Sequence, residues 1–258
     1  MCTKSINQEA GMRPLVVANW KMNGSEPMLR SLVQALGERQ NEIAAEVVLA
    51  LPAPFFSLAR ALLHSSGITW GGQNIHSLKE GAFTGEISGK MLTEMGGRWS
   101  LIGHSERRAF AGETDELVAD KVLACLDMGL TPIVCLGEHL EDREQGKTIQ
   151  VIDRQLQAIM SVVRPEEMKN LVFAYEPIWA IGTGQEATPE MAQAVHHHLK
   201  DKMVTKGSNC PSILYGGSVK GENVSGLLAM PDIDGVLVGG ASLDPEGFAA
   251  LCVNAGQG

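Results

Sequence analysis

The feature of this sequence that most constrains its fold is a regular alternation of short apolar runs with longer amphipathic stretches. Eight short runs have the composition of strands buried on both faces of a sheet. These runs are Leu15–Ala18, Val47–Leu51, Ile68–Gly71, Trp99–Ile102, Pro132–Leu136, Leu171–Tyr175, Ser212–Tyr215 and Gly235–Val238. Helices are predicted between and after them, at Glu26–Gln40, Pro54–His64, Gly89–Met95, Thr114–Met128, Lys147–Val162, Pro189–Lys206, Val219–Leu228 and Pro245–Val253.

Strands that alternate with helices predict a parallel sheet, because a parallel connection needs a crossover helix. Eight such units in 258 residues fit a closed (β/α)8 barrel of the α/β class better than an open doubly wound sheet or two smaller domains. No change in composition marks a second domain. We therefore expect one barrel over residues 12–258 and a disordered extension over residues 1–11, which are polar.

Composition and charge argue against several classes of function. The formal net charge is −9 and no long basic run occurs, so the electrostatic pattern of a nucleic-acid-binding protein is missing. No run of about twenty apolar residues could cross a membrane. The five cysteines form no C-x-x-C pair, and the first eleven residues do not resemble a secretory signal. Together these features predict a reduced, cytoplasmic setting without a zinc ribbon.

In a (β/α)8 barrel the active site lies at the carboxyl ends of the strands, so the residues directly after each run are the candidates for function. Polar residues and glycines gather at these positions. They are Asn19 and Lys21 after the first run, Gln73 and Asn74 after the third, Gly103–Glu106 after the fourth, Glu138 after the fifth, Glu176 after the sixth, Gly216–Ser218 after the seventh, and Gly239 and Gly240 after the eighth.

The stretch after the sixth run has the pattern of a base beneath a hinged lid. Glu176 ends the run and Pro177 follows it directly. The apolar triplet Trp179–Ile181 then leads into Gly182–Gly184. Proline restricts one end of this segment, and glycine permits large dihedral changes at the other. A solvated glutamate in a strand-to-helix loop is the plainer alternative.

Two further features of the rim suggest how an anionic ligand is handled. His104 precedes Ser105, which is typical of a helix N-cap, and the positive end of a helix disfavours imidazolium, so we predict a neutral ring. The turns Gly216–Ser218 and Gly239–Gly240 follow the seventh and eighth runs, where exposed backbone N–H groups commonly bind phosphate in such barrels. The plainer alternatives are that His104 only hydrogen-bonds a helix amide in a structural corner, and that the two glycine turns are only tight connections.

Two other motifs suggest rival functions. The tract His196–His198 looks like a metal site, but consecutive helical residues point about 100° apart, whereas two histidines that share a metal lie four positions apart. Gly182, Gly184 and Ala187 match a loose dinucleotide-binding fingerprint, which makes a nicotinamide-dependent oxidoreductase the rival function. That fingerprint needs its first glycine directly at the strand end, and here Glu176–Ile181 intervene.

Four motifs in order along the chain resemble the triosephosphate isomerase family. They are Val17–Gly24, Ile102–Arg108, Ala174–Gly184 and Tyr215–Val219. The similarity covers about residues 13–255. Residues 1–11 depart from the usual start of the family, and the loop at residues 74–83 matches less securely.

The resemblance implies a single-domain TIM barrel that interconverts dihydroxyacetone phosphate and D-glyceraldehyde 3-phosphate without a cofactor or a metal. It implies that Glu176 is the base on carbon, that neutral His104 moves a proton between the two oxygens of an enediol, and that Lys21 stabilises negative charge. The further positions that it implies are Asn19 as a substrate contact, Glu106 as a carboxylate near Lys21, and Gly182, Ser218, Gly239 and Gly240 as the phosphate grip.

The resemblance also implies a homodimer, because the loop Gln73–Glu86 is similar to the segment with which family members brace Asn19 and Lys21 of a partner subunit. A lyase of the same barrel class that forms a Schiff base on Lys21 is the main alternative among enzymes. A barrel that only binds a ligand is the alternative outside enzymes, and it would leave the coincidence of these rim residues unexplained.

Overall fold

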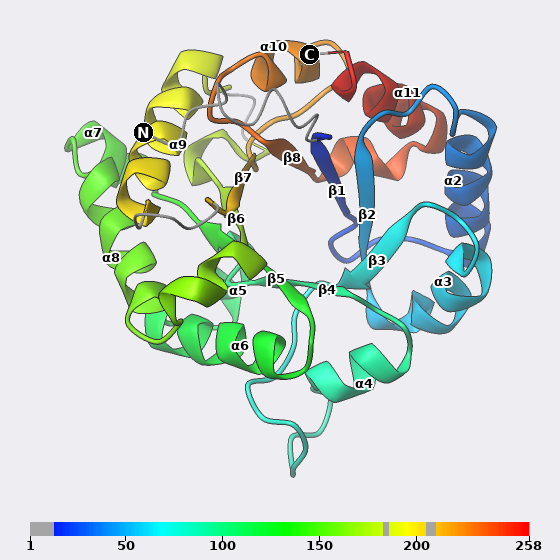
Figure 1. The fold of residues 1–258 in the computed structure, drawn as a ribbon, viewed down its shortest axis with the longest axis horizontal. Coiled ribbons are helices and arrows are strands. Elements are labelled where there is room, and N and C mark those ends of the chain that lie inside the picture. Colours follow the sequence, from blue (N-terminus) through cyan, green and yellow to red (C-terminus); the bar gives the residue numbers. More distant parts are fainter. Residues whose placement is uncertain (1–12, 183–185, 205–209, 258) are drawn as a thin grey trace.

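The computed structural model describes residues 13–182, 186–204 and 210–257. Within them, eight parallel strands pair in sequence order, and β1 pairs with both β2 and β8, so the barrel closes (Figure 1). The strands are β1 (Leu15–Asn19), β2 (Glu46–Leu51), β3 (Thr69–Gly72), β4 (Trp99–Ile102), β5 (Thr131–Leu136), β6 (Val172–Tyr175), β7 (Ser212–Tyr215) and β8 (Gly235–Val238). The predicted single-domain (β/α)8 barrel is confirmed, whereas the predicted extension at residues 1–11 lies outside the described residues.

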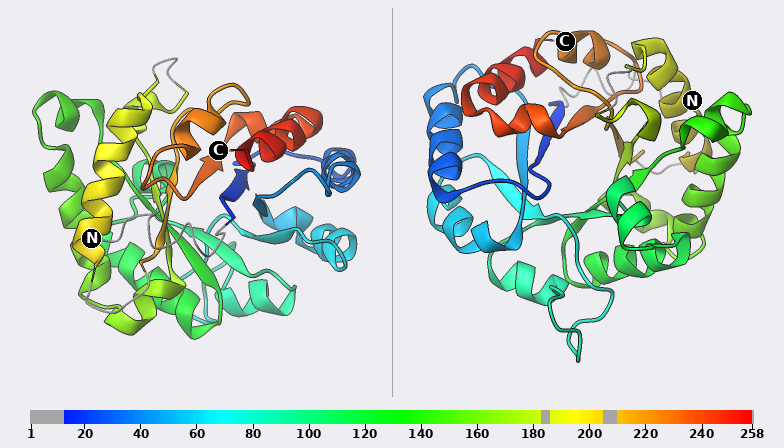
Figure 2. Two further views of the ribbon diagram at one scale, coloured as in Figure 1. Left: turned by 45° about the horizontal axis from the view of Figure 1, so that its top comes forward. Right: turned by 180° about the vertical axis from the view of Figure 1, so that it is seen from behind.

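Helices surround the barrel on all sides, as the two further views in Figure 2 show. The α-helices of the described residues are α2 (Glu26–Glu38), α3 (Phe56–Leu63), α4 (Gly89–Glu94), α5 (Ser105–Phe110), α6 (Asp115–Asp127), α7 (Leu140–Glu144), α8 (Thr148–Met160), α9 (Pro189–Met203), α10 (Val224–Leu228) and α11 (Pro245–Ala255). Short 3-10 turns are η2 (Ala53–Phe55), η3 (Pro165–Asn170), η4 (Ile178–Ala180) and η5 (Gly240–Leu243).

Local chemistry explains where several of these helices begin. The hydroxyl of Thr188 accepts a hydrogen bond from the Met191 amide at 3.2 Å, which satisfies one of the unpaired N–H groups at the start of α9. Pro189 fills the first helical position, where its missing N–H group costs nothing. Ser25, Ser88 and Thr114 cap α2, α4 and α6 in the same way.

The structure differs from the helix predictions at three helices. No range was predicted for α5, although a helix start was expected at Ser105, and α7 was missed, because six and five residues are too few to show a helical period. The helix predicted at Val219–Leu228 begins only at Val224. The Asn223 carboxamide stabilises a turn before it, accepting from the Lys220 amide at 2.8 Å and donating to the Ser218 carbonyl at 3.1 Å. The predicted end of α9 at Lys206 falls outside the described residues.

The apolar character of the strands reflects burial on both of their faces. In β1, Leu15 and Val17 belong to a cluster inside the barrel, while Val16 and Ala18 pack outward against the helices. The inner cluster consists of Leu15, Val17, Val48, Ala50, Leu101, Ile133, Cys135, Val172, Ala174, Leu214 and Leu237. Burial of each leucine, valine or isoleucine side chain contributes about 1.5–3 kcal/mol. This packing makes the barrel a rigid support for the loops at its ends.

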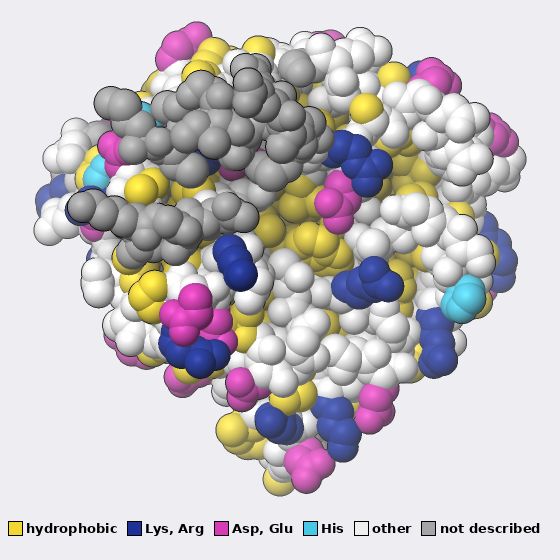
Figure 3. All heavy atoms as spheres, in the orientation of Figure 1, with side chains coloured by type: hydrophobic (Ala, Val, Ile, Leu, Met, Phe, Trp, Pro, Cys, Tyr) yellow, Lys and Arg dark blue, Asp and Glu magenta, His cyan; other side chains and the backbone are white. Residues whose placement is uncertain are grey.

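On the face drawn in Figure 3, lysine and arginine side chains lie scattered among acidic and uncharged groups. Among the described residues, no helix is long and apolar enough to cross a membrane.

Candidate active site

Glu176 is fixed at the end of β6 by backbone contacts to both neighbouring strands. Its amide donates to the Leu136 carbonyl at 2.7 Å, and the Gly216 amide donates to the Tyr175 carbonyl at 2.7 Å. Gly137 permits this close approach, because a Cβ atom there would lie 1.9 Å from the Glu176 carbonyl oxygen. The chain therefore delivers the Glu176 side chain to the end of the barrel where the strands terminate.

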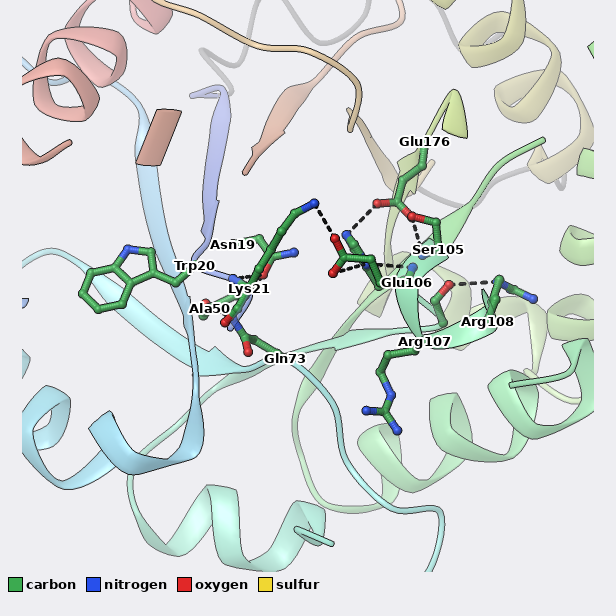
Figure 4. Close-up of polar contacts among 12 residues, drawn as sticks. Asn19, Trp20, Lys21, Ala50, Gln73, Ser105, Glu106, Arg107, Arg108 and Glu176 are labelled. Carbon is green, nitrogen blue, oxygen red and sulfur yellow. Dashed lines mark hydrogen bonds and ion pairs between the residues drawn. The ribbon is translucent and has the colours of Figure 1, made fainter. Parts of the chain in front are cut away.

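The Glu176 carboxylate is only 2% exposed, and each of its oxygens has a partner. Oε1 lies 2.9 Å from Nε2 of His104, and Oε2 accepts the Ser105 amide at 2.8 Å (Figure 4). Burial raises the pKa of Glu176, but the His104 ring and the Ser105 N–H group together lower it by more, so the net shift is downward. The buried carboxylate is therefore ionised at neutral pH and able to accept a proton.

His104, and not Ser105 as predicted, is the N-cap of α5. Its Nδ1 accepts the Glu106 amide at 3.3 Å, which requires Nδ1 to carry no hydrogen. The hydrogen of a neutral ring then lies on Nε2, facing Glu176.

The charge state of His104 depends on more than the helix end that the sequence argument considered. Burial lowers the pKa of His104, but the nearby carboxylates of Glu176 and Glu106 raise it more, so the net shift is upward. The largest raising influence on the pKa of His104 is the charge of Glu176. The neutral ring in the reacting complex stays a prediction.

Lys21 has a backbone conformation that its neighbours stabilise. Its φ angle is +52°, and it is the one non-glycine residue with positive φ in the described part of the chain. Such a conformation costs about 1–3 kcal/mol. The Lys21 amide donates to Asn19 Oδ1 at 3.0 Å, and Gln73 Nε2 donates to the Lys21 carbonyl at 2.8 Å and to Asn19 Oδ1 at 3.2 Å. This network sets the direction of the Lys21 side chain.

The ammonium group of Lys21 is held at the centre of the site. Nζ donates to Glu106 Oε1 at 2.6 Å, and Figure 4 shows the Lys21 side chain, from the loop after β1, reaching toward Glu106 of α5. Gly239 leaves room for this lysine, because a Cβ atom on Gly239 would lie 3.2 Å from Lys21 Cε. A larger residue there would crowd the lysine.

One cavity of about 450 Å³ brings the predicted site residues together. Its lining includes Asn19, Lys21, His104, Glu176, Gly182, Ser218, Gly239 and Gly240. The glycines and Ser218 lie at loops after β6, β7 and β8, and Gly182 has a φ of +69° that only glycine adopts without strain. Glu106 lies outside this cavity and lines an adjoining one of about 320 Å³ together with Gln73.

Glu138 lies next to the site, outside both cavities, and the sequence did not reveal its role. It is fully buried, and its Oε1 accepts from Tyr175 at 3.1 Å, Trp179 Nε1 at 3.0 Å and Arg143 at 3.3 Å. The Arg143 guanidinium also lies over the Trp179 ring, 4.6 Å from its centroid. Glu138 thereby holds η4, the turn that follows Glu176. Of the predicted hinge Gly182–Gly184, residues 183 and 184 lie outside the described residues.

The rival motifs do not form sites of their own. The three consecutive histidines have separate partners: His196 contacts the Asp232 carbonyl, His197 the Asp232 carboxylate and His198 the Asp153 carboxylate. Within the described ranges, no group of three potential ligands could hold a metal ion. Gly182 follows η4 and does not lie directly at the end of β6, as a dinucleotide turn requires.

Comparisons with known proteins agree with this geometry. A profile of the triosephosphate isomerase family matches residues 14–255. The triosephosphate isomerase of Nitrosococcus oceani is 47% identical over 247 residues, which cover 94% of this chain and 99% of that protein. That of Herminiimonas arsenicoxydans is 47% identical over 242 residues, covering 93% and 98%. A match of this extent is decisive, and the chain belongs to the triosephosphate isomerase family.

Proposed function

We propose that this chain interconverts dihydroxyacetone phosphate and D-glyceraldehyde 3-phosphate through an enediolate, as a step of glycolysis and gluconeogenesis. The observation that carries the proposal is the 450 Å³ cavity, which joins the paired Glu176 and His104 at one end to the glycine turns at the other. A triose phosphate has a reacting carbon pair and a phosphate that match these two ends.

Glu176 takes the proton from carbon. A C–H bond beside a carbonyl is too weakly acidic to ionise at a useful rate in water, so a positioned and ionised base is required. Burial and the lowered pKa keep the carboxylate charged and poorly hydrated. When the substrate binds, it replaces His104 and Ser105 as the partner of the Glu176 carboxylate.

His104 and Lys21 stabilise the negative charge that moves onto oxygen. The Nε2–H group of His104 donates to that oxygen and passes a proton between the two oxygens of the enediol. The Lys21 ammonium contributes a full positive charge, and Asn19 contacts the substrate while fixing the Lys21 backbone. Glu106 holds the ammonium in place.

The phosphate binds through backbone N–H groups of Gly182, Ser218, Gly239 and Gly240. These groups suit a dianion because they supply partial positive charge without side chains that need neutralisation. Neither a metal nor a cofactor is part of the proposed reaction. The Schiff-base alternative is weakened by the 2.6 Å contact between Lys21 and Glu106, since an ammonium paired with a carboxylate is a poor nucleophile.

The assembly that we propose is an isologous homodimer in the cytoplasm, built from a barrel domain over residues 12–258. The loop between β3 and α4 extends away from the barrel (Figure 1), and it carries exposed Leu78 and Phe83. Met22 and Phe110 are also exposed, at 96% and 89%. Apolar groups left in water favour a partner surface. Three buried cysteine thiols, Cys125, Cys135 and Cys252, fit a reducing compartment.

A coupled assay tests the proposed function. Purified protein is given D-glyceraldehyde 3-phosphate, and the dihydroxyacetone phosphate formed is reduced by an NADH-dependent dehydrogenase. We expect rapid turnover that Glu176→Gln abolishes almost completely. Borohydride treatment during turnover should leave the protein unmodified. A stable adduct on Lys21, or no isomerisation by the unaltered protein, would overturn the proposal.

A further inference from the structure

A half-exposed ion pair lies beside the phosphate end of the site and takes no part in the chemistry proposed above. Lys220 Nζ donates to Glu186 Oε1 at 2.7 Å, and the side chains are 56% and 47% exposed. Lys220 lines the 450 Å³ cavity two residues after Ser218, whereas Glu186 does not line it. The positively charged partner is therefore the one at the cavity wall.

The backbone of Lys220 is held in place relative to the phosphate turn. The Lys220 amide donates to Asn223 Oδ1 at 2.8 Å, and Asn223 Nδ2 donates to the Ser218 carbonyl at 3.1 Å. One carboxamide thus bridges the residue that binds phosphate and the residue that carries the charge. The Lys220 backbone therefore stays next to the phosphate site.

Few positively charged side chains line this cavity. Among its described lining residues, only Lys21 and Lys220 carry a full positive charge, and Lys21 is already paired with Glu106. The chain as a whole has a formal net charge of −9, which repels a phosphate dianion. The charges of Lys220 and Glu186 therefore make a large contribution to the electrostatic potential that an approaching substrate meets.

We propose that the Lys220–Glu186 pair sets the affinity of this enzyme for phosphate dianions, with Lys220 increasing it and Glu186 decreasing it. The proposal rests on the isomerase function proposed above. The rival explanation is that the ion pair only holds together the two chain segments that carry Lys220 and Glu186, as a mechanical tether.

Exposed ion pairs contribute little to stability, because water screens them and two long side chains must be ordered. Their charges nevertheless act on a dianion across about 10 Å at low salt.

The two explanations predict different signs for single substitutions. Lys220→Gln and Glu186→Gln both break the pair, so a tether predicts changes in the same direction. If the charges act on the ligand, the inhibition constant of inorganic phosphate should change in opposite directions. It should rise in Lys220→Gln and fall in Glu186→Gln. For a dianion at about 10 Å in water, each change should be about two- to fourfold at low ionic strength. The kcat/KM for D-glyceraldehyde 3-phosphate should fall and rise correspondingly, with kcat unchanged.

Three controls make the comparison specific. Lys202→Gln removes a lysine of similar exposure, paired with Asp153 at 3.0 Å and outside the cavity, and should change neither constant. Activity on D-glyceraldehyde, which has no phosphate, should be the same in all variants. Raising the ionic strength from about 10 mM to about 0.5 M should remove the differences.

The outcome separates this inference from the function on which it rests. Shifts in the same direction for both variants, or no shift in either, would overturn the role of the pair while leaving the isomerase activity intact. Calorimetric binding of inorganic phosphate to the three variants gives the same comparison without turnover. The double variant should fall between the two single variants if the charges act independently.

Discussion

Nε2 of His104 lies 2.9 Å from Oε1 of Glu176, so the proposed acid and the proposed base contact each other directly in the unliganded chain. The second carboxylate oxygen is occupied by the Ser105 amide at 2.8 Å. These contacts stabilise the ionised carboxylate, and they account for much of the upward pKa shift of His104. In the proposed reaction, a substrate inserts between the two side chains, so that Glu176 becomes a base on carbon and His104 a donor to oxygen.

The role of Glu176 is tested by Glu176→Gln. The amide keeps the shape and can still accept the Ser105 N–H group, but it cannot take a proton. We expect kcat to fall by roughly 10²–10⁴, with little change in the folded protein. Steady-state kinetics and circular dichroism are the measurements. Retention of more than half of the original kcat would contradict the assignment.

Lys21 is expected to act on both phosphate affinity and the developing oxyanion. Lys21→Met removes the charge but keeps a long side chain, so KM should rise and kcat should fall together. Activity on the neutral substrate D-glyceraldehyde should fall by a smaller factor, because that substrate has no dianion to attract. Equal proportional losses on the two substrates would show that Lys21 does not serve the phosphate.

Much of this fold and site could be predicted because it depends on the type and position of individual residues along the chain. The apolar runs marked all eight strands to within one or two residues, since burial on both faces makes most strand positions apolar. The position directly after each strand then identified Asn19, Lys21, His104 and Glu176 as neighbours, because a closed barrel gathers its strand ends.

Other features depend on contacts between segments far apart in sequence. Glu113 pairs with both Arg107 and Lys121, and Lys121 also donates to Asn74 at 2.7 Å, yet nothing local distinguishes this buried network. The positive φ of Lys21 is stabilised by Gln73, more than fifty residues later. Pair-specific distances of this kind do not produce a periodic pattern, so the sequence cannot reveal them.

His196 gives a prediction about acid stability. Burial lowers its pKa to about 3, and nearby Lys200 lowers it too, while Asp232 opposes both. Below about pH 6.5 the unfolded chain binds a proton here that the folded chain does not, so stability falls as the pH falls toward 3. Between pH 7 and 5 this group alone should remove about 2 kcal/mol from the free energy of unfolding.

Urea unfolding of His196→Gln at pH 7 and pH 5 measures this contribution. The variant should lose about 2 kcal/mol less than the unaltered chain over this interval, although it is less stable at pH 7. His64→Gln is the matched control, because His64 is exposed and its ring hydrogen-bonds with the exposed Ser65 hydroxyl. If His196→Gln and His64→Gln show the same pH dependence, His196 is not the group responsible.

The proposed homodimer predicts that activity depends on assembly. Replacing exposed Phe83 in the loop after β3 by aspartate should favour monomers, because a charge would be buried at the partner surface. The monomer should be nearly inactive, since the partner loop is expected to brace Asn19 and Lys21. Light scattering at the assay concentration gives the oligomeric state. A fully active monomer would contradict the prediction.

The segment over Glu176 is expected to protect the reaction intermediate from water. Once carbon has lost its proton, the enediolate can expel its phosphate unless the site holds the phosphate in plane and excludes solvent. Ile181 and Gly182 line the cavity, while Trp179 is anchored to Glu138 at 3.0 Å. Deleting Ile178–Ile181 should therefore leave the barrel folded and lower kcat by about 10²-fold or more. It should also divert product toward methylglyoxal and free phosphate.

The decisive measurement is the amount of methylglyoxal formed per isomerised triose phosphate. Trp179→Phe is the control, because it removes the hydrogen bond to Glu138 but keeps the length and apolar character of the segment. We expect a ratio near that of the unaltered enzyme for this control and a much higher ratio for the deletion. A folded deletion variant whose ratio stays at the unaltered value would show that the segment only connects β6 to α9, since loss of solvent exclusion cannot leave elimination unchanged.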